Sequence, residues 1–80
     1  MANYRLSLSD TWVQIANNVP YLVQNRGNIP VLIQSNDSTP TDDNLSFYLP
    51  SSQTISDSVL DGVVWVKAWN GKTAEIVYKV

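Results

Sequence analysis

The chain has 80 residues, a formal net charge of −2, and neither cysteine nor histidine. This composition excludes a disulfide framework, zinc sites built on thiolates or imidazoles, and any catalysis that uses Cys or His. The five basic residues are scattered along the chain, so we expect no nucleic-acid partner, which would need clustered positive charge. The length fits a single domain, residues 1–80, with a small core.

The amino-terminal stretch MANYRLSLSD lacks the uninterrupted apolar region of a secretory signal. No apolar run approaches the roughly 20 residues that are needed to cross a bilayer. The sequence therefore predicts a soluble domain without a membrane partner.

Prolines and glycines divide the chain into short apolar segments, a spacing typical of strands. In the first segment Tyr4, Leu6 and Leu8 alternate with polar residues, which predicts a half-buried strand. Residues 12–16, WVQIA, allow two interpretations, because a polar residue just before them could cap a short helix. Their β-branched and aromatic side chains favour the strand.

The segments YLVQN and IPVLIQ predict a hairpin, because only a short polar connection with one glycine separates them. We expect Gly27 to take the positive φ that a tight connection requires. Pro30 cannot donate a hydrogen bond to a neighbouring strand, so its own strand should begin there or lie at a sheet edge.

The middle of the chain mixes clear and ambiguous segments. Residues 35–44, SNDSTPTDDN, predict an exposed loop without a packed side chain of consequence. Alternating apolar residues predict another half-buried strand directly after it: Leu45, Phe47 and Leu49. Residues 51–62 are ambiguous. Three apolar side chains there could close one end of the core: Ile55, Val59 and Leu60.

The last 18 residues, VVWVKAWNGKTAEIVYKV, predict a second hairpin whose loop length decides which side chains are buried. A two-residue turn sets Val66 opposite Glu75 and mixes apolar and charged residues on both faces. A three-residue loop pairs Val66 with Ala74 and Val64 with Ile76, and it separates the two kinds of residue. The second register is therefore favoured. Its buried face consists of Val64, Val66, Ala68, Ala74, Ile76 and Tyr78.

The opposite face of this hairpin and its tip carry a candidate interface. Its members are Trp65, Lys67, Trp69 and Val77, with Glu75 expected near Trp65. One account is that a loop of the same chain covers the tryptophans. The other is that they bind a partner, because exposed aromatics supply much of the contact area in protein interfaces and also stack on sugars or bases.

No catalytic constellation is evident in the sequence. Asp42 and Asp43 are adjacent, so their side chains should diverge into solvent rather than face a common substrate. The serines have no histidine to activate them, and the acidic residues lack the spacing of a calcium loop. We therefore expect a non-enzymatic protein without a metal or other cofactor.

Three stretches together resemble small virion proteins of tailed bacteriophages: WVQIA, YLVQNRGNIPVLIQ with its Ser/Asp/Pro loop, and GVVWVKAWNGKTAEIVYKV. The resemblance covers most of the chain. It implies a compact β-sandwich or barrel that attaches to the capsid exterior, often as a trimer, or that sits in head fibres and tail accessories. It implies no catalytic residues.

The sequence thus predicts an all-β fold, a small antiparallel β-sandwich or barrel of about seven to eight short strands. The leading functional hypothesis is a capsid decoration or cement protein, a homo-oligomer that binds the major capsid protein or another virion protein. The alternative is a carbohydrate- or receptor-binding module of a phage tail or fibre. Either protein would reside in the virion after assembly in the cytoplasm of the host bacterium.

Overall fold

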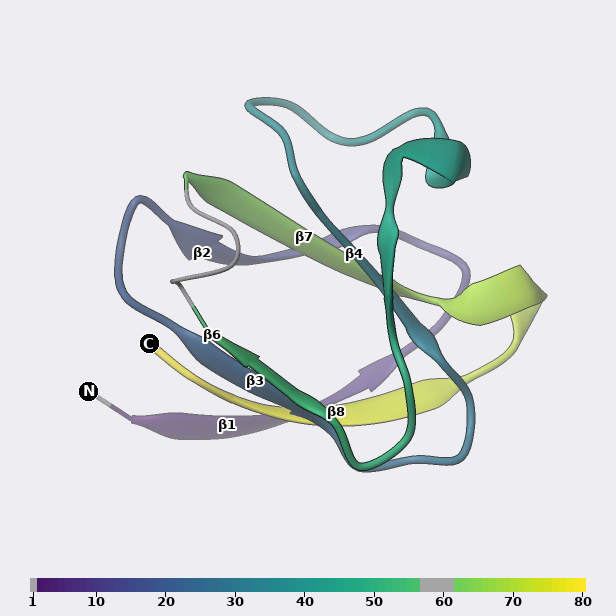
Figure 1. The fold of residues 1–80 in the computed structure, drawn as a ribbon. Coiled ribbons are helices and arrows are strands. Elements are labelled where there is room, and N and C mark those ends of the chain that lie inside the picture. Colours follow the sequence, from purple (N-terminus) through teal and green to yellow (C-terminus); the bar gives the residue numbers. More distant parts are fainter. Residues whose placement is uncertain (1, 57–61) are drawn as a thin grey trace.

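The computed structural model describes residues 2–56 and 62–80, and in these residues eight strands form two antiparallel sheets. The two sheets pack face to face as the layers of a small sandwich (Figure 1). The only helical elements in this part of the chain are two single 3-10 turns, Asp43–Leu45 and Trp69–Gly71. The predicted all-β sandwich is therefore confirmed.

Each sheet has four strands, and each takes its strands from distant parts of the chain. Sheet 1 has the order β1 (Asn3–Leu8), β8 (Ala74–Lys79), β3 (Leu22–Asn25) and β6 (Thr54–Ser56). Sheet 2 has the order β2 (Val13–Asn17), β7 (Val63–Ala68), β4 (Val31–Ser35) and β5 (Phe47–Leu49).

Neither predicted hairpin forms. β3 and β4 lie in different sheets, and so do β7 and β8. Val66 is opposite Val13 and Ile33 rather than Ala74, and Ile76 is opposite Leu6 and Asn25 rather than Val64. The physical reason is that crossing between the layers places β7 and β8 each between two other strands, whereas a hairpin would pair them with each other.

The turn that was expected to close the second hairpin instead carries the chain from sheet 2 to sheet 1. Asn70 and Gly71 both have positive φ, 55° and 69°, in the 3-10 turn after β7. The backbone N–H of Trp69 donates to the carbonyl of Pro30 at 3.1 Å, which ties this turn to the start of β4. These two left-handed residues redirect the chain out of its layer.

The prediction for Gly27 was wrong, since the glycines with positive φ in the described residues are Gly62 and Gly71. Gly27 is constrained by space instead, because a Cβ atom there would lie 3.3 Å from the backbone nitrogen of Glu75. Of the two alternatives for Pro30, the structure agrees with a strand that begins at this point, since β4 starts at the next residue, Val31, and lies inside its sheet.

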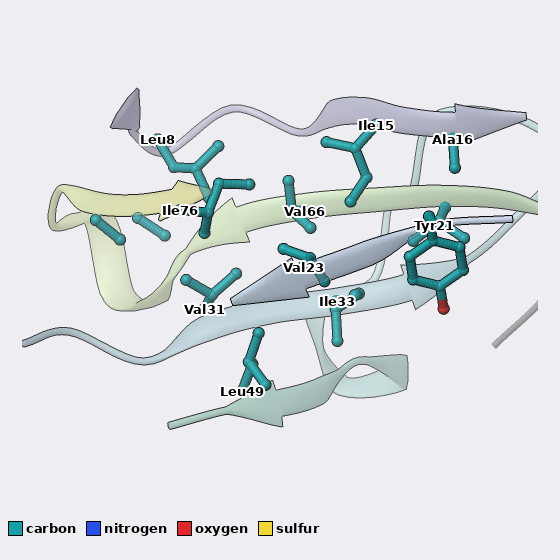
Figure 2. Close-up of a cluster of buried hydrophobic side chains, with 13 residues drawn as sticks. Leu8, Ile15, Ala16, Tyr21, Val23, Val31, Ile33, Leu49, Val66 and Ile76 are labelled. Carbon is teal, nitrogen blue, oxygen red and sulfur yellow. The ribbon is translucent and has the colours of Figure 1, made fainter. Parts of the chain in front are cut away.

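The buried face of the last two strands agrees with the sequence prediction, although their pairing does not. Five of the six predicted residues are buried and Tyr78 packs against the core from its margin. Figure 2 shows side chains from both sheets, among them Val23, Ile33 and Val66, meeting in one cluster. Alternation decides which side of a strand faces inward whatever its neighbour is.

The strand interpretation of residues 12–16 is confirmed for residues 13–16, which lie in β2, whereas Trp12 precedes the strand; β2 contains a register shift between Gln14 and Ala16. Because of this shift two consecutive residues, Ile15 and Ala16, are both buried. The strand predicted from residue 45 is shorter than expected. Leu49 is buried, but Phe47 is exposed and Leu45 lies in the preceding 3-10 turn. Ile55 packs against the core, whereas Val59 and Leu60 lie outside the described residues.

Candidate functional site

The four residues that the sequence assigned to an interface do not share one surface. Trp65 and Lys67 lie on the outer face of sheet 2, Val77 lies on the outer face of sheet 1, and Trp69 lies in the turn between the sheets. Glu75 is on the outer face of sheet 1, where it accepts from Arg5 with Nη2 to Oε1 at 2.9 Å, so its expected place beside Trp65 was wrong.

The outer face of sheet 2 is covered by residues 36–46, which we call the covering segment. Trp65 Nε1 donates to the carbonyl of Asn36 at 2.8 Å. The amide nitrogen of Gln34 donates to the carbonyl of Asp42 and, at 2.9 Å, to the hydroxyl of Ser46. Pro40 within the segment is buried. The prediction of a loop without packed side chains was therefore wrong. The covering segment forms an additional layer that packs on the outer face of sheet 2.

Lys67 is the centre of this outer layer and is only 8% exposed. Its ammonium donates to Asp43 at 2.6 Å, lies 3.5 Å from Asp10, and sits 5.3 Å from the ring centre of Trp12. The hydrogen bond with Asp43 raises the pKa of Lys67 above its ordinary value of 10.5, despite the opposing effect of burial. Asp43, which was expected to be solvated, is thus a partner of the lysine.

These contacts indicate that Lys67 has a structural role. A buried ammonium without a carboxylate would be costly, and the covering segment and the connection before β2 each bring one carboxylate to it. The aromatic face of Trp12 adds a cation–π contact. Within the described residues, Lys67 therefore ties two connections to the outer face of sheet 2.

An exposed apolar surface lies at the β5 edge of sheet 2, and we call it the β5 ridge. Its residues are Leu45, Phe47 and Tyr48, with exposed fractions of 67%, 59% and 60%. Phe47 and Tyr48 point to opposite sides of the edge strand, because successive residues of a strand alternate. Trp69 borders the ridge, since its Nε1 donates to the hydroxyl of Tyr48 at 3.1 Å.

Sequence reasoning missed this ridge, because alternation placed Phe47 in the core together with Leu49. The alternation was correct about direction, since Phe47 is opposite the buried Ile33. It could not show that β5 is a three-residue edge strand on which Phe47 stays 59% exposed. Only the nearby turn residues and Pro50 hinted that the strand is short.

The outer face of sheet 1 carries a shallow hollow of about 340 Å³ around Val77. Its lining mixes amide, hydroxyl, ammonium and apolar groups: Asn3, Leu22, Gln24, Thr54, Val77, Tyr78 and Lys79. No carboxylate is among them, so the hollow lacks the paired acids of a hydrolytic site.

In residues 2–56 and 62–80, no three His, Cys, Asp or Glu side chains are grouped closely enough to hold a metal ion. No helix in the same ranges is long and apolar enough to span a membrane.

Comparisons of the chain with protein-family models, with curated proteins and with solved structures found no match.

Proposed function

We propose that this chain is a non-enzymatic structural protein that decorates the capsid exterior of a tailed bacteriophage and binds it through the β5 ridge. The observation that carries the proposal is the exposure of three large apolar side chains within residues 45–48, where a 3-10 turn leads into the edge strand β5. Exposed apolar surface concentrated in this way is characteristic of protein interfaces, in which aromatic side chains often dominate the binding energy.

The viral context rests on the resemblance of the sequence to small virion proteins. In this proposal the partner is the major capsid protein or another virion protein, and the chain joins the virion after synthesis in the bacterial cytoplasm. Tyr48 and Trp69, joined by their hydrogen bond, add contact surface on the other side of the same edge strand. The chain itself acts as a homo-oligomer, which would multiply weak contacts with a repetitive capsid surface.

A carbohydrate- or receptor-binding role in a tail or fibre is the second candidate. The observation in its favour is the hollow on sheet 1, whose volume of about 340 Å³ is within the range of small-ligand sites and whose amide and hydroxyl groups could bind a sugar. Trp65 contributes less than the sequence suggested, because it is half-buried and its indole N–H already donates to Asn36.

Two matched double variants separate the candidates. L45S/F47S removes apolar surface from the ridge, and V19S/L22S removes two apolar side chains that are each 46% exposed, one of them in the hollow. We expect the first variant to lose at least about tenfold in affinity for capsids, the effect of truncating an interface anchor, and the second to bind like the wild type.

The measurement is co-sedimentation with capsids assembled from the major capsid protein of the same genome, with the fold of each variant checked by circular dichroism. A wild-type chain that stays in the supernatant, or an L45S/F47S variant that binds with unchanged affinity, contradicts decoration. Glycan binding that V19S/L22S abolishes and L45S/F47S leaves intact would establish the second candidate instead.

A further inference from the structure

The outer edge of β1 is an open strand edge that runs the length of sheet 1. β1 lies on the rim of the sheet beside β8 (Figure 1), and the two strands pair without a break from Asn3 opposite Lys79 to Leu8 opposite Ala74. Just before it, Ala2 and Val80 exchange both of their backbone hydrogen bonds, at 3.2 and 3.4 Å.

This exchange fixes which backbone groups of β1 are unpaired. In an antiparallel pair, hydrogen-bonded positions alternate with positions whose N–H and C=O point away. Ala2 is hydrogen-bonded to β8, so the even positions of β1 also bond to β8. The odd positions point their N–H and C=O groups outward, and all three are exposed: Asn3, Arg5 and Ser7.

The other three edges of the sandwich are blunted by means that proteins commonly use against unwanted strand pairing. β2 contains a register shift at Ile15, and β5 and β6 are three residues long. β1 has six residues, a regular register, and neither proline nor lysine. Among the described strands it is therefore the edge best suited to accept another strand.

We propose that β1 pairs with β1 of a second copy of this chain around a two-fold axis, so that the two copies of sheet 1 form one continuous eight-stranded sheet. The antiparallel register places Leu6 opposite Leu6 of the second copy and Arg5 opposite Ser7 of the second copy. Arg5 and Ser7 both have outward backbone groups, so they form hydrogen-bonded pairs in this register.

Charge selects this register over its neighbour. A relative shift of the two strands by two residues would set Arg5 directly opposite Arg5 of the second copy, and like charges in that position are destabilising. In the proposed register the guanidinium lies beside a serine whose neighbour within its own sheet is Glu75. Arg5 already forms an ion pair with Glu75 of its own chain. In the dimer each Arg5 would therefore lie between this Glu75 and, across Ser7 of the second copy, Glu75 of the second copy.

The inward side of the same register buries apolar surface. Leu6 is half-buried and meets its own copy, while Tyr4, which is 48% exposed, faces Leu8 of the second copy. Tyr4 is already oriented by stacking on Tyr78, with ring centres 5.3 Å apart. The pairing thus covers a tyrosine that the single chain leaves in water.

The inference gives a geometry to the homo-oligomer of the proposed function, but its contact is separate from the capsid contact, because the β5 ridge belongs to the other sheet and stays accessible. The test uses a backbone change that the β1–β8 pairing should tolerate. Ser7→Pro removes an N–H that points outward and adds a ring at the edge, whereas Ser7→Ala keeps the N–H.

We expect light scattering after size-exclusion chromatography to show a dimer for the wild type and for S7A, and a monomer for S7P. A wild-type monomer or trimer at high micromolar concentration overturns the proposal, and so does a folded S7P that remains a dimer.

Single cysteines provide a second test that does not depend on the folding of S7P, because the chain has no cysteine of its own. Leu6→Cys places two thiols opposite each other at a non-hydrogen-bonded pair, where Cβ atoms come closest. We expect L6C to form a disulfide-linked dimer under mild oxidation and R5C to form little. Absence of cross-linking in L6C, in which Arg5 is retained, contradicts the register.

Discussion

At the scale of single residues, Lys67 holds two connections against the outer face of sheet 2, a role that its position in the sequence does not reveal. It stands between Trp65 and Trp69 in the chain, and its carboxylate partners come from two distant connections. A surface ion pair is usually worth little. Here the lysine side chain is 10% exposed while that of Asp43 is 50% exposed, so the pair lies between the surface and the buried case.

Replacing this lysine tests the role of the outer layer. Lys67→Met keeps the aliphatic stem and removes the ammonium, and we expect a loss of about 1 to 2 kcal/mol in the free energy of unfolding at neutral pH, below the cost of breaking a fully buried pair. Lys72→Met is the control, because Lys72 is exposed and its substitution should have little effect. Urea unfolding followed by tryptophan fluorescence measures both.

The pH dependence of that difference follows from the raised pKa of Lys67. A group whose pKa is higher in the folded than in the unfolded protein stabilises the fold fully below its unfolded pKa, and this stabilisation is lost as the pH rises through the folded value. The difference between wild type and K67M should therefore be constant around neutrality and shrink above pH 10.5. A difference that persists unchanged in strong alkali would mean that Lys67 acts through packing alone.

At the scale of elements, the crossing from β3 to β4 depends on the side chain of one buried residue. Asn25 Nδ2 donates to the carbonyls of Ile29 and Leu49, both at 2.9 Å, and its Oδ1 accepts from the N–H of Gly27 at 2.9 Å. Asn25 ends a strand of sheet 1, and Leu49 ends a strand of sheet 2. These bonds therefore hold the two layers together at the point where the chain changes sheet.

Substituting Asn25 should cost much more than substituting the half-buried polar residue beside it on the outer face of the same strand, Gln24. Asn25→Ala leaves two carbonyls and one N–H without this partner, and we expect a loss of about 2 to 4 kcal/mol in the free energy of unfolding. Asn25→Asp should be at least as damaging, because it turns a donor into a second acceptor facing two carbonyls. Gln24→Ala on the outer face is the matched control. Thermal and urea unfolding measure the stability of the three variants, and an N25A variant as stable as the wild type would contradict the prediction.

At the scale of the whole molecule, strands that are far apart in the chain form almost all of the sheet. Of the pairings in the described residues, only β4 with β5 joins consecutive strands, whereas β1 with β8 joins the two ends of the chain. Such pairings require large loops to close before contacts compensate for the lost entropy. The crossings between sheets make the fold less local than the two predicted hairpins would have made it.

This topology predicts slow folding for so short a chain. We expect refolding from urea on a time scale of milliseconds to seconds, as for other sandwiches dominated by non-local pairing, rather than the microseconds reached by domains rich in local contacts. Stopped-flow tryptophan fluorescence can measure this, because the chain has three tryptophans. A main phase completed within the dead time of the instrument would contradict the prediction.

The sequence by itself determined the class of fold, most of the strands and the direction of their side chains. These properties are local, since alternation of apolar and polar residues sets the inner face of Val64, Val66 and Ile76 whatever strand lies beside them. Composition likewise removed cysteine and histidine chemistry from consideration. The tertiary structure alone decided which strands are neighbours, because a turn that closes a hairpin and a turn that crosses between layers use the same glycine and asparagine residues. It also decided which side chains meet water: the covering segment encloses Lys67 through Asp43, while Phe47 is left exposed on a short edge strand.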